Sequence, residues 1–231
     1  MSSIRSVTLA SAASLLALAG AANATVIYSN NFENTAPGSE WANGRYSAAP
    51  AFSQFMGRYD TTNSTTLSLA PVAPPGGGDV PGGGSGGQSL LYTVTFDFYP
   101  IDSWDGTSAI NGPDLFELKI NGAIVFNEPF ANHSQSSLQA FRTPDVGPAP
   151  LGFGTDADSI YRNIAVDFTV DPAATLIQIK FRGSLGSPMA DESWGIDNVR
   201  VSYQVVPEPG AAALLVLGGL VAARRRRSAR A

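Results

Sequence analysis

The strongest constraint on the fold of this chain is a series of short segments in which apolar and polar residues alternate. In residues 92–98 every second side chain is Tyr, Val or Phe, and residues 176–181 repeat the pattern with Ile and Phe. A period of two residues is typical of a β-strand with one buried face. Helical periodicity is almost absent between Thr25 and Gln204. The sequence therefore predicts an all-β domain.

Turn residues divide this region into about ten such segments. Asn121-Gly122 tolerates the positive φ that a two-residue type I′ turn needs, which predicts a hairpin at that point. Eight to ten short strands in about 180 residues are typical of a single antiparallel β-sandwich, such as a jelly roll. The predicted strands cover residues 26–32, 45–59 with a break, 65–69, 90–99, 115–120, 123–127, 138–142, 161–170, 176–182 and 194–204.

One segment does not fit the strand pattern. Residues 71–87 contain eight Gly and four Pro, a composition that predicts disorder. The segment is either a linker between domains or a long loop within one domain. Only 46 residues, from Thr25 to Ala70, precede it in the domain, and we expect their strands to pair with strands beyond the segment. We therefore predict a loop inside a single domain that covers residues 25–205.

Charge and composition exclude several classes of function. The 231-residue chain has no Cys, which excludes a disulfide scaffold, a Cys-ligated metal site and a thiol nucleophile. Its single histidine, His133, excludes a multi-histidine metal site. The formal net charge is −5, but six of the 14 basic residues lie at the chain ends: residues 25–206 carry eight basic and 18 acidic side chains, which gives −10. An acidic domain argues against nucleic acid as a partner.

Residues 1–24 have the pattern of a secretory signal peptide. Arg5 gives a basic start, residues 7–22 are largely apolar, and Ala22-Asn23-Ala24 supplies the small residues that signal peptidase needs before its cleavage point. A buried helix or a membrane anchor fits less well, because the stretch is short for a membrane span. We expect cleavage after Ala24 and export of the protein.

Residues 206–231 join a short motif, an apolar run and a basic cluster. Pro207, Glu208 and Pro209 precede 14 residues at positions 210–223 that are all Gly, Ala, Leu or Val. Next comes a cluster of four arginines: Arg224, Arg225, Arg226 and Arg227. A 14-residue helix rises about 21 Å, less than the hydrocarbon core of a bilayer at about 30 Å. The arginines orient such a segment with its C-terminal end in the cytoplasm. We expect a marginal transmembrane helix that holds the chain transiently in the inner membrane.

This order of features resembles the PEP-CTERM sorting signal of exported proteins in Gram-negative bacteria. The resemblance implies that an exosortase-type membrane enzyme recognises and processes the segment after signal peptidase has acted. It also implies an inner-membrane-anchored intermediate, which then reaches the outer surface or the extracellular matrix, and an association with extracellular polysaccharide and biofilm. The alternative is an ordinary C-terminal anchor with a chance tripeptide. The resemblance implies nothing about the activity of the central domain.

The sequence contains no recognisable catalytic motif. G-x-S-x-G, H-E-x-x-H and P-loop patterns are absent, and His133 lies in a polar stretch that is typical of a solvated loop. Carboxylate pairs for glycoside hydrolysis are defined by their separation in space, so Asp102 with Asp105 and Asp191 with Glu192 remain candidates. We expect a protein without catalytic activity.

Oxygen-rich segments predict a structural Ca²⁺ site, since Ca²⁺ takes six to eight oxygen ligands. Residues 102–114 form one such region, and residues 31–33 together with residues 191–198 form the other. The first and last strands of an antiparallel sandwich are often neighbours, so Glu33 and Asp197 are expected to meet. The alternative is that Asp197 only caps backbone N–H groups at a strand edge.

The two ends of the domain resemble jelly-roll carbohydrate-binding modules of the lectin or galactose-binding kind. Asn31-Phe32-Glu33 and the stretch 193–201, which contains Ile-Asp-Asn-Val, match the opening and closing motifs of those modules. The resemblance implies that Glu33 and Asp197 ligate a structural calcium ion.

Sugar binding also requires exposed aromatic side chains, and the three tryptophans lie in turn-like polar contexts. For Trp104, which Asp102 and Asp105 flank, a sugar platform with the two acids as further ligand contacts and a position at the end of the core both remain open. For Trp194 we expect a position in the core.

Together these features predict an exported, non-enzymatic β-sandwich of the cell envelope or extracellular matrix that binds polysaccharide. An extracellular glycan hydrolase with a carboxylate pair and a purely structural matrix protein are the alternatives.

Overall fold

Twelve β-strands make up the part of the chain that the computed structural model describes, which comprises residues 24–33, 36–73, 89–132 and 141–206. These residues contain no helix. The strands are β1 (Thr25–Asn30), β2 (Trp41–Ala42), β3 (Tyr46–Ala49), β4 (Phe52–Tyr59), β5 (Ser64–Leu69), β6 (Ser89–Asp102), β7 (Leu115–Ile120), β8 (Ala123–Pro129), β9 (Val146–Ala149), β10 (Asp158–Phe168), β11 (Ile177–Ser184) and β12 (Glu192–Val206).

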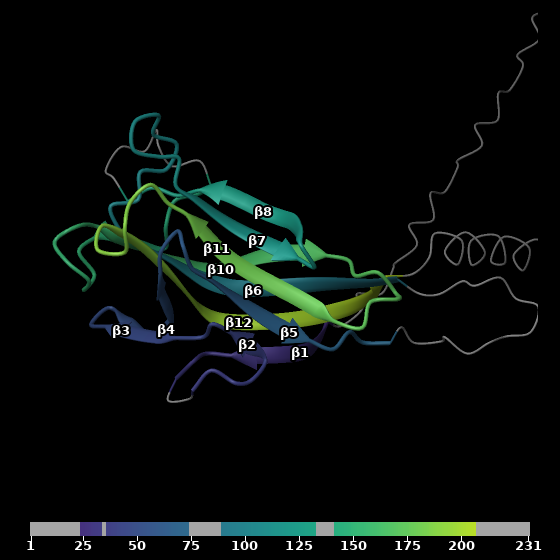
Figure 1. Ribbon diagram of the computed structural model, residues 1–231. Coiled ribbons are helices and arrows are strands. Elements are labelled where there is room, and N and C mark those ends of the chain that lie inside the picture. Colours follow the sequence, from purple (N-terminus) through teal and green to yellow (C-terminus); the bar gives the residue numbers. More distant parts are fainter. Residues whose placement is uncertain (1–23, 34–35, 74–88, 133–140, 207–231) are drawn as a thin grey trace, which may run out of the picture. The chain divides into compact units, whose positions relative to one another are not determined.

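The strands form two antiparallel sheets. One sheet has seven strands in the order β3-β4-β12-β6-β10-β9, with β1 also paired to β12. The other has five strands in the order β2-β5-β11-β7-β8. Figure 1 shows the long strands β6 and β12 side by side in one layer, with β7, β8 and β11 in the other. The predicted all-β sandwich is confirmed.

Aromatic rings fill the core between the sheets. Phe96 and Phe98 of β6 point toward the opposite sheet, as the two-residue period predicts. The ring of Phe96 lies 5.4 Å from that of Phe181 on β11, and the ring of Phe98 lies 4.0 Å from that of Phe116 on β7. Because these contacts cross from one sheet to the other, the alternating apolar residues are the side chains that hold the sandwich together.

The end of β6 is buried on both faces. Up to Thr95, buried positions alternate with partly exposed ones along the strand, whereas every later residue is buried. A second apolar cluster covers the outer face at this end and consists of Phe52, Phe55, Tyr99, Ile101 and Ile160. Polar side chains at this end of the sandwich are therefore held away from bulk solvent.

Strand β12 lies at the centre of its sheet. It pairs with β6 from Glu192 to Val206, and on its other side it pairs with β4 and then with β1. Gly195 of β12 faces Gly57 of β4, and a Cβ at Gly195 would lie 2.3 Å from the ring of Phe55. The glycine at this position leaves the space that the buried ring occupies.

The predicted hairpin is confirmed. Asn121 and Gly122 have φ angles of 48° and 88°, as a type I′ turn requires, and they connect β7 to β8. Strands β2 and β9 were not predicted, since they have only two and four residues and β9 contains a proline. Of the strand predicted at 138–142, residues 138–140 lie outside the described residues, and residues 141–142 are not in a strand.

Several other predictions concern residues that the structure does not describe. These are the signal peptide before Ala24, most of the Gly/Pro-rich segment, His133, and the C-terminal motif with its apolar run and arginines. Strands on the two sides of the Gly/Pro-rich segment pair with each other, β4 with β12 and β5 with β11. Within the described ranges there is no helix of sufficient length and apolar character to cross a membrane.

Candidate functional site

The loop that follows β6 turns inward and not toward solvent. Trp104 is 0% exposed, and its indole N–H donates a hydrogen bond to the Ser193 carbonyl oxygen at 2.7 Å. Its ring packs edge-on against Phe98 at 5.5 Å. The prediction of a sugar platform at Trp104 is therefore wrong, and the alternative position at the end of the core is correct. Trp41 and Trp194 are buried as well.

Asp102 belongs to an internal ion pair. Its carboxylate contacts the Arg58 guanidinium, which also donates to the Ser193 hydroxyl at 2.7 Å and to the Met189 carbonyl oxygen at 2.9 Å. Burial raises the pKa of Asp102 to about 6, although the positive charge of Arg58 acts in the opposite direction. Asp102 is 3% exposed, so it is not placed to contact a ligand in solvent as predicted.

Three other acids gather next to this loop. Asp105 follows β6, Asp114 immediately precedes β7, and Glu192 begins β12. One carboxylate oxygen from each lies within 4.8 Å of the others, and all three residues are buried. We call these three residues the acidic triad. In the sequence, Asp105 and Asp114 belong to one oxygen-rich region and Glu192 to the other, and the structure brings the two regions together.

Backbone hydrogen bonds hold the acidic triad in place. The Asp114 carboxylate accepts from the N–H groups of Asp105 and Gly186, and the Asp114 N–H donates to the Gly106 carbonyl oxygen at 2.9 Å. Glu192 Oε2 accepts from the Ser187 N–H at 2.8 Å. The loop between β6 and β7 and the loop between β11 and β12 are thus tied to each other around the carboxylates.

One oxygen of the acidic triad is left without a partner. Glu192 is 1% exposed, and its Oε1 atom is buried with no hydrogen bond. A buried carboxylate oxygen without a donor is costly, because the group has lost its water and gained nothing in exchange. Glu192 Oε1 is therefore an oxygen that a bound cation could serve.

Burial also changes the acidity of the triad. It raises the pKa of Asp114 to about 6 and that of Glu192 to about 7. Hydrogen bonds from the Asp105 and Gly186 N–H groups partly offset the rise for Asp114, while the negative charge of Asp105 adds to it in both cases. The cluster therefore disfavours its own ionisation and favours any cation that neutralises it.

A polar hollow of about 670 Å³ opens beside the acidic triad. Asp105 belongs to both, and Ser187, whose N–H holds Glu192, lies on the wall of the hollow. The other lining residues are Ser103, Ile110, Asn111, Gly112, Gly186 and Asp191. The hollow gives solvent and small solutes access to the edge of the triad.

The second predicted calcium position lies elsewhere on the same sheet. Strand β1 pairs with β12 as expected, and the negative charge of Glu33 is one of the influences that raise the pKa of Asp197, after burial, to about 6. Asp197 accepts hydrogen bonds from the Tyr99 hydroxyl at 3.0 Å and from the Asn198 N–H at 2.7 Å. Both oxygens of the Asp197 carboxylate already accept a hydrogen bond. Calcium at Glu33 and Asp197 stays a prediction.

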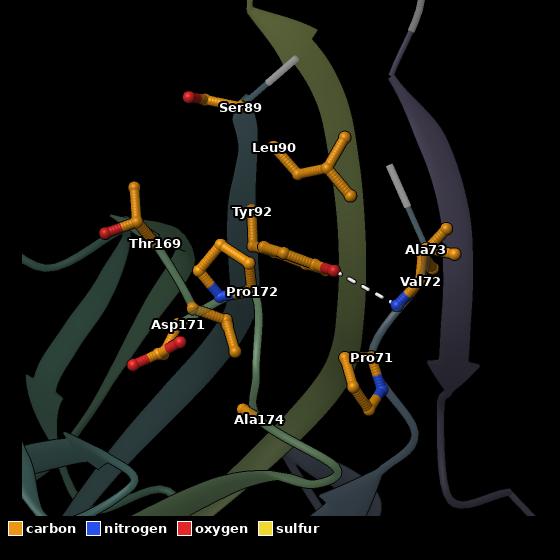
Figure 2. Close-up of a pocket in the computed structure, with 11 residues that line it drawn as sticks. Pro71, Val72, Ala73, Ser89, Leu90, Tyr92, Thr169, Asp171, Pro172 and Ala174 are labelled. Atoms are coloured by element: carbon orange, nitrogen blue, oxygen red, sulfur yellow. Dashed lines mark hydrogen bonds between the residues drawn. The ribbon is translucent and has the colours of Figure 1, made fainter. Parts of the chain in front are cut away.

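An apolar hollow of about 770 Å³ lies at the opposite end of β6 (Figure 2). Leu90 and Tyr92 of β6 line it together with Pro71, Val72 and Pro172, and the Tyr92 hydroxyl accepts a hydrogen bond from the Val72 N–H at 3.1 Å. None of the acidic triad lines this hollow. Ser89, Thr169 and Asp171 add polar side chains to its wall, but only one of them is a carboxylate.

The members of each carboxylate pair predicted for hydrolysis lie in different surroundings. Asp102 is engaged with Arg58, whereas Asp105 belongs to the acidic triad. Asp191 is exposed and Glu192 is buried, although they are neighbours in the sequence. Asp105 and Glu192 instead meet in the acidic triad with Asp114, which neither predicted pair contains.

No protein-family model and no curated protein matches the chain. Among solved structures, dimeric latent PorU from Porphyromonas gingivalis is similar at 14% sequence identity with a TM-score of 0.40. That alignment covers 75% of this chain and 14% of the PorU chain. A likeness this distant carries no argument about fold or function.

Proposed function

We propose that the chain is an exported β-sandwich protein that is sorted to the cell envelope or extracellular matrix and binds polysaccharide there without catalysis. The observation that carries the proposal is the order of features at the C-terminus. Pro207-Glu208-Pro209, the apolar run and the arginine cluster follow directly on the last described strand, whose final residue is Val206. A cleavable leader at the other end agrees with this route.

The polar hollow supports a binding role. Its walls carry the hydroxyl side chains of Ser103 and Ser187, the amide of Asn111 and the carboxylate of Asp191. Such groups form hydrogen bonds with sugar hydroxyls. With all three tryptophans buried, we propose recognition by hydrogen bonding and not by stacking on an indole ring.

Binding is tested with the exported protein purified from the producing cells and a panel of immobilised neutral and acidic polysaccharides. We expect at least one polysaccharide to retain the protein, and Asn111→Ala to weaken retention. Asn127→Ala is the matched control, because Asn127 is an exposed amide on β8 and does not line the hollow. Failure of every polysaccharide to retain the protein would refute the binding role.

Sorting is tested by mass spectrometry of the released protein. We expect the mature chain to begin at Thr25 and to lack the C-terminal arginines. Recovery of intact Arg230 in the released protein would contradict processing of the C-terminal segment.

One observation favours a glycan hydrolase as the second candidate. The pKa of Glu192 is raised to about 7 next to two further acids, a combination that suits a general acid. The acid is almost fully buried, which leaves its carboxyl little access to a glycosidic bond, so we rank hydrolysis second. Release of reducing ends from a polysaccharide, abolished in Glu192→Gln, would reverse this order.

A further inference from the structure

The structure points to a calcium site at Asp105, Asp114 and Glu192, separate from the Glu33 and Asp197 position that the sequence predicts. This inference does not depend on polysaccharide binding or on sorting. It rests on the acidic triad, on one unpartnered buried oxygen, and on the access that the polar hollow provides.

The geometry of the acidic triad fits one ion. Calcium binds oxygen atoms at 2.3–2.6 Å, so two ligands on opposite sides of an ion are about 5 Å apart. The three carboxylate oxygens all lie within 4.8 Å of one another, which allows them to share a single coordination sphere. The remaining ligand positions are open to water from the hollow that Asp105 lines.

The unpartnered oxygen is the second observation. Glu192 Oε2 accepts the Ser187 N–H, whereas Oε1 is buried without a donor in a residue that is 1% exposed. Backbone N–H groups fix the carboxylates of Asp114 and Glu192, yet one oxygen of Glu192 has no donor, and this loss of hydration lowers the stability of the fold. A bound cation removes that loss, because it coordinates the free oxygen and offsets the mutual repulsion of the acids.

The donor set selects the kind of metal. All three side chains offer carboxylate oxygens, and the chain has no Cys to bind a soft metal. Hard cations prefer such ligands, and Ca²⁺ tolerates an irregular arrangement of oxygens better than Mg²⁺, which demands a near-ideal octahedron. Calcium is therefore the ion that best suits ligands from two separate parts of the chain, the β6–β7 loop and the start of β12.

Such an ion would connect the two sheets. Asp105 and Glu192 belong to the ends of β6 and β12 in one sheet, while Asp114 immediately precedes β7 in the other. The sandwich has no disulfide, so calcium would provide the cross-link between layers at this end. Its removal should loosen the loops of residues 103–114 and 185–191 before the rest of the fold.

The test uses the exported protein after dialysis against EGTA, with CaCl₂ as the added ligand. Calorimetric titration should show one Ca²⁺ bound at this site, and the melting temperature should rise by about 5 °C or more at 100 times the dissociation constant. Glu192→Gln and Asp114→Asn should each weaken binding about tenfold or more. Asp167→Asn, an exposed acid on β10 outside the triad and the hollow, should change the affinity less than about threefold.

The melting temperature in EGTA distinguishes a variant that has lost the calcium site from one that has lost its fold. Glu192→Gln keeps an oxygen for the Ser187 N–H and removes one buried charge, so in EGTA it should melt at or above the temperature of the unmodified protein. It should then gain little from calcium. A lower melting temperature of this variant in EGTA would count against the inference.

Two further outcomes would overturn the inference. One is an unchanged melting temperature and no measurable heat on addition of millimolar CaCl₂. The other is calcium binding that Asp197→Asn abolishes and Glu192→Gln leaves unchanged, which would assign the ion to the Glu33 and Asp197 position. Neither outcome bears on polysaccharide retention, which is measured separately.

Discussion

The two fully buried tryptophans of the β6 and β12 ends should differ in their contribution to stability. Trp104 and Trp194 are both 0% exposed and both pack on phenylalanine or tyrosine rings. The Trp104 indole N–H donates to the Ser193 carbonyl oxygen at 2.7 Å, whereas the Trp194 indole N–H is buried without a partner. Substitution of each by phenylalanine removes the N–H and a similar amount of ring.

Both variants lose a similar amount of packing, so the difference between their free energies of unfolding comes from the indole N–H groups. Trp104→Phe also loses a hydrogen bond, worth about 0.5–1.5 kcal/mol net. Trp194→Phe removes a buried unsatisfied donor, which relieves about 1–3 kcal/mol. The free energy of unfolding of Trp104→Phe should therefore lie about 1.5–4.5 kcal/mol below that of Trp194→Phe.

Chemical denaturation followed by far-ultraviolet circular dichroism measures this difference. Both variants should keep the same denaturant dependence as the unmodified protein, so that the midpoints report stability alone. A Trp194→Phe variant that is as destabilised as Trp104→Phe, or more so, would refute the reasoning that the two indole N–H groups differ.

Two further predictions concern close packing and pH. Gly195→Ala places a Cβ 2.3 Å from the buried Phe55 ring, so it should lower the free energy of unfolding by about 1–3 kcal/mol. Denaturant titration measures this loss. An unchanged midpoint would show that the Phe55 ring moves aside at no cost. Burial raises the pKa values of Asp102 and Asp197 to about 6, above the value of about 3.9 in an unfolded chain. The folded state therefore binds these protons more tightly than the unfolded state, so the stability of calcium-free protein should fall as the pH rises from about 4 to 6. Asp197→Asn should flatten this dependence of stability on pH. A stability that rises over this range would contradict the raised pKa values.

The strands and the tight turn could be predicted because each depends on residues that are close together in the sequence. Alternation specified the strands that build the core, and Asn121-Gly122 specified a turn whose φ angles the structure reproduces. Strands β2 and β9 escaped prediction because they are too short to show a period, and their pairing depends on longer neighbours.

The site depended on information that single segments do not carry. Asp105, Asp114 and Glu192 were recognised as oxygen donors, but their meeting depends on the register that places Glu192 opposite Asp102 across β6 and β12. The error at Trp104 has a related cause. Flanking aspartates indicated exposure, whereas Asp102 adopts a positive φ of 66° at the end of β6, and the ring beyond it enters the core.

The pairing of β12 has a mechanical consequence for a protein held by its C-terminus. Val206 ends the strand, and the next residue is Pro207 of the C-terminal motif, so tension from that side enters along the axis of β12. The ladder to β6 extends from Glu192 to Val206, and its hydrogen bonds run across the strand direction. A pull at Val206 therefore loads these bonds together in shear, and does not peel them apart one by one. A tethered sandwich of this kind should resist flow and traction far better than one whose edge strand leads to its anchor.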